Sequence, residues 1–180
     1  MGALSKRRFA GKFLLAFTVL LVLWWAVDFP THYRTAVLAS AQMCSPAVNG
    51  WWLDYDRPDA VGNVVFRAGD RELAMLLQLR ALSMGIVPLV SLVVATPRQS
   101  VKRIARNVVL GVVLYFAVHV AVVLTYPFIM NRPNALKDTL GVFTGLMAFV
   151  VAPLGLWFML TYPALRSLWQ LNPHAGRTKT

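Results

Sequence analysis

His119 stands in the middle of a long apolar stretch, and its neighbours make it a candidate for chemistry. Tyr115, His119 and Tyr126 follow the spacing i, i+4, i+11, which places the three side chains on one face of a helix. An ionisable residue at bilayer depth is a functional hypothesis by default. This face could relay protons or hold a ligand. In the plainer interpretation, a neutral imidazole hydrogen-bonds a hydroxyl of another span, the candidates being Ser91, Thr18 and Thr144.

Cys44 is the only cysteine, and His32 lies twelve residues before it in an arginine-rich segment. A nucleophilic cysteine needs a base and an orienting group, so this pair suggests a small cysteine hydrolase or transpeptidase. The alternative is that Cys44 is a small apolar residue at the membrane surface. One cysteine excludes an internal disulfide and a cysteine-based zinc cluster. The three histidines fall in three different segments, so we expect no metal site and no cofactor.

The composition is that of a membrane protein. Of the 180 residues, 58% are hydrophobic, and the mean hydropathy is +0.59; a soluble domain has about 45–50% apolar residues. A net charge of +11 could suit nucleic acid. The basic residues instead stand beside apolar runs, as they do at the ends of membrane helices. We therefore expect membrane lipid around the chain and no nucleic acid.

The apolar runs predict four membrane-spanning helices, at 11–29, 81–97, 108–130 and 140–165. Roughly 20 residues of helix cross ~30 Å of hydrocarbon. The first run could belong to a cleavable signal peptide. Its best small-x-small site, 39–41, lies about a dozen residues beyond the apolar run, which is too far, so we expect an uncleaved helix.

The distribution of Lys and Arg predicts the orientation. The segments 1–10, 98–107 and 166–180 are basic and contain no acid, whereas 30–80 balances its five arginines with five acids and 131–139 carries little charge. Basic segments stay in the cytoplasm. We therefore expect a multi-pass protein of the bacterial inner membrane with both termini cytoplasmic and with 30–80 and 131–139 outside.

The segment 30–80 predicts a small extracytoplasmic domain. Residues 31–44 can form a short amphipathic helix lying on the membrane, and Trp51, Trp52 and Tyr55 suit interface anchors. A turn at 68–71 between segments 63–67 and 72–80 predicts a β-hairpin. The rival interpretation is a helix continuous with the second span.

The fourth span carries a stripe of small residues that includes a GxxxG pattern. Such a stripe lets another helix approach closely, whether from the same chain or from a partner protein. Its members are Gly141, Gly145, Ala148, Ala152 and Gly155.

The segment 64–97 resembles the exosortase H-associated membrane proteins, in which a short extracytoplasmic β segment runs into a proline-containing span. The residues that carry the resemblance are Ser83, Gly85, Pro88, Leu89, Ala95, Thr96 and Pro97. The resemblance implies a non-catalytic companion of a membrane cysteine transpeptidase that processes surface proteins with C-terminal sorting tags. No catalytic residue of the family carries over.

The expected fold is therefore an all-α membrane protein of four transmembrane helices with a small loop domain between the first two. The expected function is that of a non-catalytic accessory protein that binds another integral membrane protein. Two alternatives stay open: an enzyme that uses Cys44 and His32, and a small transporter or channel component that uses the His119 face.

Overall fold

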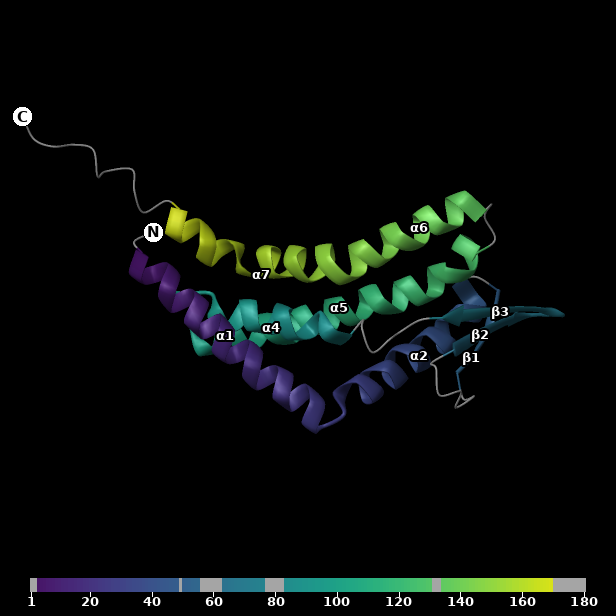
Figure 1. Ribbon diagram of the computed structural model, residues 1–180, viewed down its shortest axis with the longest axis horizontal. Helices are drawn as coiled ribbons and strands as arrows, with labels where there is room; N and C mark the ends of the chain where they lie inside the picture. Colours follow the sequence, from purple (N-terminus) through teal and green to yellow (C-terminus); the bar gives the residue numbers. More distant parts are fainter. Residues whose placement is uncertain (1–2, 49, 56–62, 77–82, 131–133, 170–180) are drawn as a thin grey trace, which may run out of the picture.

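The computed structural model describes residues 3–48, 50–55, 63–76, 83–130 and 134–169. Figure 1 shows three layers, with α6 and α7 on one side, α4 and α5 in the middle, and α1 and α2 on the other. The elements in chain order are α1 (Ala3–Ala26), α2 (Phe29–Val48), β1 (Trp52–Asp54), β2 (Asn63–Ala68), β3 (Arg71–Leu76), α4 (Ile86–Ala95), α5 (Val101–Met130), α6 (Asn134–Leu146), the π-helical turn η1 (Met147–Val151) and α7 (Ala152–Trp169).

Three helical stretches in the described part of the chain are long and apolar enough to cross a membrane: Arg7–Ala26, Val101–Met130 and Asn134–Arg166. This confirms the prediction of a mostly helical chain with membrane-length apolar helices. The helix in the expected 81–97 span, α4, has only 10 residues, and residues 77–82 lie outside the described part. Crossing of the membrane by α4 and the orientation of the bundle stay predictions.

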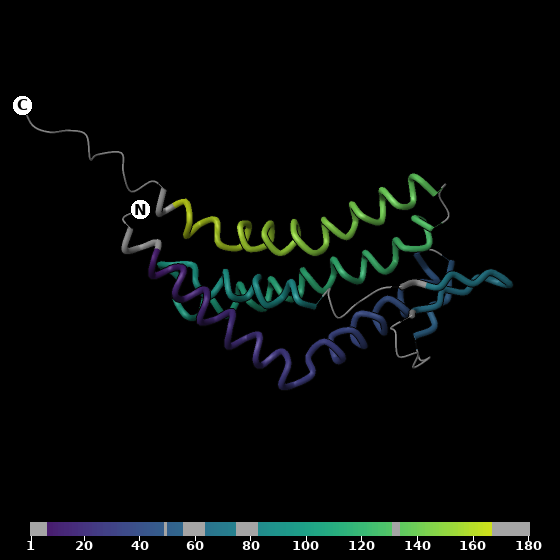
Figure 2. Tube along the Cα trace, in the orientation of Figure 1, coloured from purple at the N-terminus to yellow at the C-terminus, as the bar shows by residue number. Residues whose placement is uncertain are grey.

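A sharp bend separates α1 from α2, as the purple trace in Figure 2 shows. Asp28 takes a left-handed backbone conformation there, with φ of 45°. Pro30 is the second residue of α2, where the missing N–H costs no helical hydrogen bond. The first helix therefore ends at Ala26, three residues before the predicted end of the span.

Helix α2 is longer than the predicted 31–44 helix, and one of its faces is buried inside the protein. It packs against α5 and β1. Its inward face buries Tyr33, Val37, Leu38 and Ala41. The apolar side that we expected to face lipid is thus part of the protein core.

The predicted hairpin is present, and it is formed by β2 and β3. Gly69 and Asp70 form a two-residue turn between the paired residues Ala68 and Arg71. Gly69 supplies the positive φ, 59°, that such a turn requires at its first central position. The rival helical interpretation is wrong for Asn63–Leu76.

A third strand, β1, was not predicted. It pairs with β2 in antiparallel fashion, with Leu53 opposite Phe66. Trp51 and Leu53 are buried, whereas Trp52 is 56% exposed. Trp51 therefore fills the core beside the sheet and is no interface anchor.

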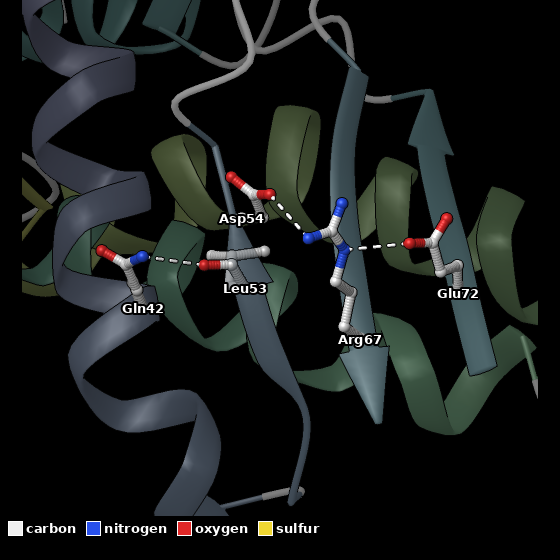
Figure 3. A network of polar contacts seen from close by, with 5 residues as sticks. All are labelled: Gln42, Leu53, Asp54, Arg67 and Glu72. Atoms are coloured by element: carbon white, nitrogen blue, oxygen red, sulfur yellow. Dashed lines mark hydrogen bonds and ion pairs between the residues drawn. The ribbon is translucent and has the colours of Figure 1, made fainter. Parts of the chain in front are cut away.

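A helix contacts each edge strand of this sheet. Gln42 of α2 donates its amide N–H to the Leu53 carbonyl at 2.9 Å, and Tyr126 of α5 donates its hydroxyl to the Ala74 carbonyl at 3.1 Å. Such contacts occupy edge groups that would otherwise be open to another strand. Figure 3 shows the Gln42 contact beside an ion-pair network in which Arg67 lies 3.3 Å from Asp54 and 3.0 Å from Glu72.

The basic segment expected as a turn at 98–107 is mostly helical. Thr96 is extended, as a residue before proline usually is, and α5 begins at Val101 and not at 108. Ser100 accepts a hydrogen bond from the Arg103 N–H at 3.4 Å and so acts as the helix cap.

The last helix likewise begins earlier than predicted. A continuous helical stretch runs from Asn134 through η1 to Trp169, so 134–139 are helical and form no loop. Residues 131–133 lie outside the described part. A π turn such as η1 inserts an extra residue into a helix and changes which side chains share a face beyond it.

Candidate functional site

Helices α5 and α2 together bury His119. Its side chain is 0% exposed, and that of Tyr33 is 7% exposed. The Tyr33 hydroxyl lies 2.7 Å from His119 Nδ1. Phe29 stacks on the Tyr33 ring at 5.6 Å, and Phe116 meets that ring edge-on at 5.8 Å. The aromatic neighbours thus hold the tyrosine in position for this bond.

The hydroxyl of Tyr33 stays protonated. Burial raises the pKa of this group above its usual value, with a further contribution from Tyr115. The direction of this bond depends on the imidazole tautomer, because a tyrosine hydroxyl can donate or accept. The other ring nitrogen, Nε2, is buried without a hydrogen-bond partner among the described residues. The Tyr33–His119 bond therefore links α2 to α5 through one ring nitrogen.

Tyr115 completes the cluster from one turn earlier on α5. Its ring centroid lies 4.2 Å from that of His119. Its hydroxyl lies against Gly85, where a Cβ would overlap it. Gly85 is one of the residues that carry the sequence resemblance. Its lack of a side chain allows α4 to approach Tyr115 closely.

Tyr126 lies apart from this cluster. It stacks on Phe66 at 5.8 Å and bonds the Ala74 carbonyl, so it holds the sheet. Two members of the predicted helix face, Tyr115 and His119, thus form a cluster with Tyr33. The third member, Tyr126, contacts the sheet. Ser91, one of the expected partners of His119, instead donates to the Val87 carbonyl.

The structure does not bring Cys44 and His32 together. Both lie on α2, and twelve residues at 1.5 Å each separate them by roughly 18 Å along the axis. Cys44 is exposed. His32 Nδ1 donates to the Asp28 carbonyl at 3.1 Å. His32 is therefore not placed to act as a base for Cys44.

The small-residue stripe is divided between two environments. Ala148 is buried, and Ala152 packs against the core. A Cβ at Gly141 or Gly155 would meet nothing within 4 Å, and at Gly145 it would touch only Phe149 of the same helical stretch. The alanines serve the bundle, whereas the glycines leave open surface.

No three His, Cys, Asp or Glu residues in the described ranges are placed to hold a metal ion. Comparisons with protein-family models, with curated proteins and with solved structures find no match. The function must therefore be argued from the geometry and from the sequence resemblance.

Sequence reasoning missed Tyr33, the residue that holds His119. Its place in α2 was visible, but α2 was expected on the membrane surface. Its spacing with Val37 and Ala41, i, i+4, i+8, marks one face of a helix. That spacing was the available signal that this face is buried.

Proposed function

We propose that the chain is a non-catalytic accessory protein of the bacterial inner membrane. It holds a small folded module, made of α2 and the three strands, in a fixed position on a helix bundle. The observation that carries the proposal is that this α2–sheet module and the bundle share one hydrophobic core. Buried members on the module side include Leu38, Leu53 and Phe66, and those on the bundle side include Leu89 and Val123.

Two hydrogen bonds also join the bundle to the α2–sheet module. Tyr33 bonds His119, and Tyr126 bonds the Ala74 carbonyl, so α5 is joined both to α2 and to β3. The buried Tyr33–His119 bond fixes one arrangement, because a slipped alternative would leave its groups unpaired. A module joined to the bundle in this way suits a protein that presents a surface to a partner.

The partner that fits is another integral membrane protein. The helical stretch from α6 to α7 exposes a broad apolar surface, with Val142, Phe143 and Leu154 among its members. Gly141 and Gly155 leave this surface open to close approach. Helices associate in lipid through close packing where side chains are small.

The resemblance of 64–97 supplies the class of partner. It supports a membrane cysteine transpeptidase of exosortase type, with this chain as the companion. In the proposed layout, four helices cross the membrane, both termini are cytoplasmic, and the sheet with the adjoining end of α2 lies outside, where the transpeptidase would meet its substrates.

Co-purification from native membranes tests the proposal. We expect Gly141→Leu and Gly155→Leu to lose a transpeptidase that the wild type retains, because leucine holds the helices apart. Val142→Leu, on a neighbouring exposed position, is the matched control and should retain it. Retention of every companion by both glycine variants would contradict the docking role.

A second experiment separates this proposal from the enzyme alternative. Cys44→Ala and His32→Ala should leave sorting of surface proteins intact, since the two side chains do not meet. Loss of sorting in both variants at normal protein levels would favour the enzyme.

A further inference from the structure

Helix α1 begins, α4 passes into α5, and α7 ends at the same end of the molecule (Figure 1). Each of these three segments carries basic residues. All eight described members are exposed: Arg7, Arg8, Lys12, Arg98, Lys102, Arg103, Arg106 and Arg166. We call this set the basic end. It contains no described acid. The acids in the described part lie at the α1–α2 bend, in the hairpin and β1, and on α6: Asp28, Asp54, Asp70, Glu72 and Asp138.

The connection that carries part of the basic end is held firmly against α7. Asn107 is 2% exposed, and it donates to Gln99 Oε1 and to the Leu160 carbonyl, both at 3.0 Å. Trp157 of α7 donates its indole N–H to Thr96 Oγ1 at 3.0 Å. Buried groups on both sides of the connection are thus bonded to neighbouring elements.

Arg98 has a left-handed backbone, with φ of 61°. A residue with a side chain rarely adopts this conformation, and the surrounding contacts must hold it. The hydrogen bonds at Thr96 and Gln99, two positions before it and one after, provide that support. The cations of this connection are therefore presented in a fixed arrangement.

We propose that the basic end binds the headgroup phosphates of anionic phospholipids. Arg and Lys form charge-assisted hydrogen bonds with phosphate oxygens, and no described carboxylate competes for them here. Each basic residue at an anionic membrane surface strengthens binding by about fivefold.

The surface beside the cations identifies the lipid as the source of the phosphate. Val109 and Leu110 follow Arg106 on α5 and are exposed, and Leu14 and Leu15 follow Lys12 on α1 in the same way. A phospholipid fits a charged surface that stands next to an apolar one, because its headgroup meets the cations while its chains cover the apolar residues. Free phosphate would satisfy only the charged part.

Lipid binding by the purified full-length chain tests the proposal. The chain is prepared in neutral detergent, and its melting is followed during titration with phosphatidylglycerol, phosphatidylcholine or inorganic phosphate. We expect phosphatidylglycerol to raise the melting temperature at the lowest concentration, and added salt to weaken this effect. Stabilisation by inorganic phosphate as strong as that by phosphatidylglycerol would overturn the assignment to a lipid.

Charge variants locate the site. Arg103→Gln should weaken phosphatidylglycerol binding about fivefold, and Lys102→Gln, Arg103→Gln and Arg106→Gln together roughly 100-fold. Arg71→Gln, which removes an exposed arginine from the hairpin, is the matched control and should bind as the wild type does. Equal binding by the wild type and by Arg103→Gln, or equal weakening by Arg103→Gln and Arg71→Gln, would overturn the proposal.

Discussion

His119 is a titratable residue bound at one ring nitrogen and buried at the other. Its partner comes from a helix 86 positions away in sequence. The bond between Tyr33 and His119 therefore fixes the position of the imidazole ring relative to α2.

Removal of this bond should destabilise the protein. We expect Tyr33→Phe to lower the free energy of unfolding by about 1–2 kcal/mol, since Nδ1 loses its partner in a buried site. Unfolding of purified variants in detergent measures this change, with Tyr162→Phe on an exposed position as the control. In a double-mutant cycle with His119→Ala, the two effects should be less than additive. Full additivity would contradict a direct contact.

Gly85 should resist substitution by alanine. Its backbone is helical, so the cost comes from space alone: a Cβ would overlap the Tyr115 hydroxyl. We expect Gly85→Ala to lower the free energy of unfolding by about 1–3 kcal/mol. Tyr115→Phe should restore part of the loss. Gly141→Ala, with open space around it, is the control and should be neutral or stabilising. A Gly85→Ala variant as stable as the wild type would show that the helices can move apart.

Among the elements, the helical stretch from α6 to α7 contributes both to the core of the bundle and to an open surface. Helix α6 buries no side chain in the described structure, whereas Ala148 in η1 is 1% exposed. The buried Ala148 lies in the π turn between the open glycines Gly141 and Gly155, so the small-residue stripe is divided between the core and the open surface.

This division predicts opposite outcomes for two similar substitutions. Ala148→Leu should lower the free energy of unfolding by about 1–3 kcal/mol, because it forces extra methylene groups into a packed core. Gly155→Leu should leave it unchanged or raise it, because the added side chain meets open surface. Thermal melting of the two purified variants is the measurement. Equal destabilisation would mean that the stripe packs as one face.

For the whole molecule, the charge distribution is the main guide to orientation. All eight members of the basic end lie together, and the described acids lie elsewhere. The positive-inside rule predicts that the basic end lies in the cytoplasm. The sheet, at the other end of the molecule in Figure 1, would then lie on the opposite side.

Thiol labelling of intact cells tests this orientation. Cys44 is the only cysteine and is exposed, so a membrane-impermeant maleimide should label it from outside. In a Cys44→Ser background, Asn134→Cys should also be labelled, and Ser100→Cys only after the membrane is opened. Labelling of Ser100→Cys in intact cells would reverse the layout.

Local features could be predicted from the sequence. The apolar stretches of the long helices and the hairpin turn at Gly69 and Asp70 depend on composition and backbone conformation over a few residues, and both were found. Helix boundaries were less accurate. The helical part of α5 extends to Val101 through basic residues, since helix formation continues beyond the apolar run wherever capping allows it.

By itself, then, the sequence determined which segments are apolar helices and where the chain reverses in the hairpin, because these follow from neighbouring residues. The tertiary structure alone decided that β1 joins the sheet, that α2 is buried, and that Tyr33 meets His119. A three-residue strand forms only where a partner strand lies beside it, and Leu53 finds Phe66 thirteen positions away. A hydroxyl 86 positions from an imidazole becomes its partner only when two helices pack together.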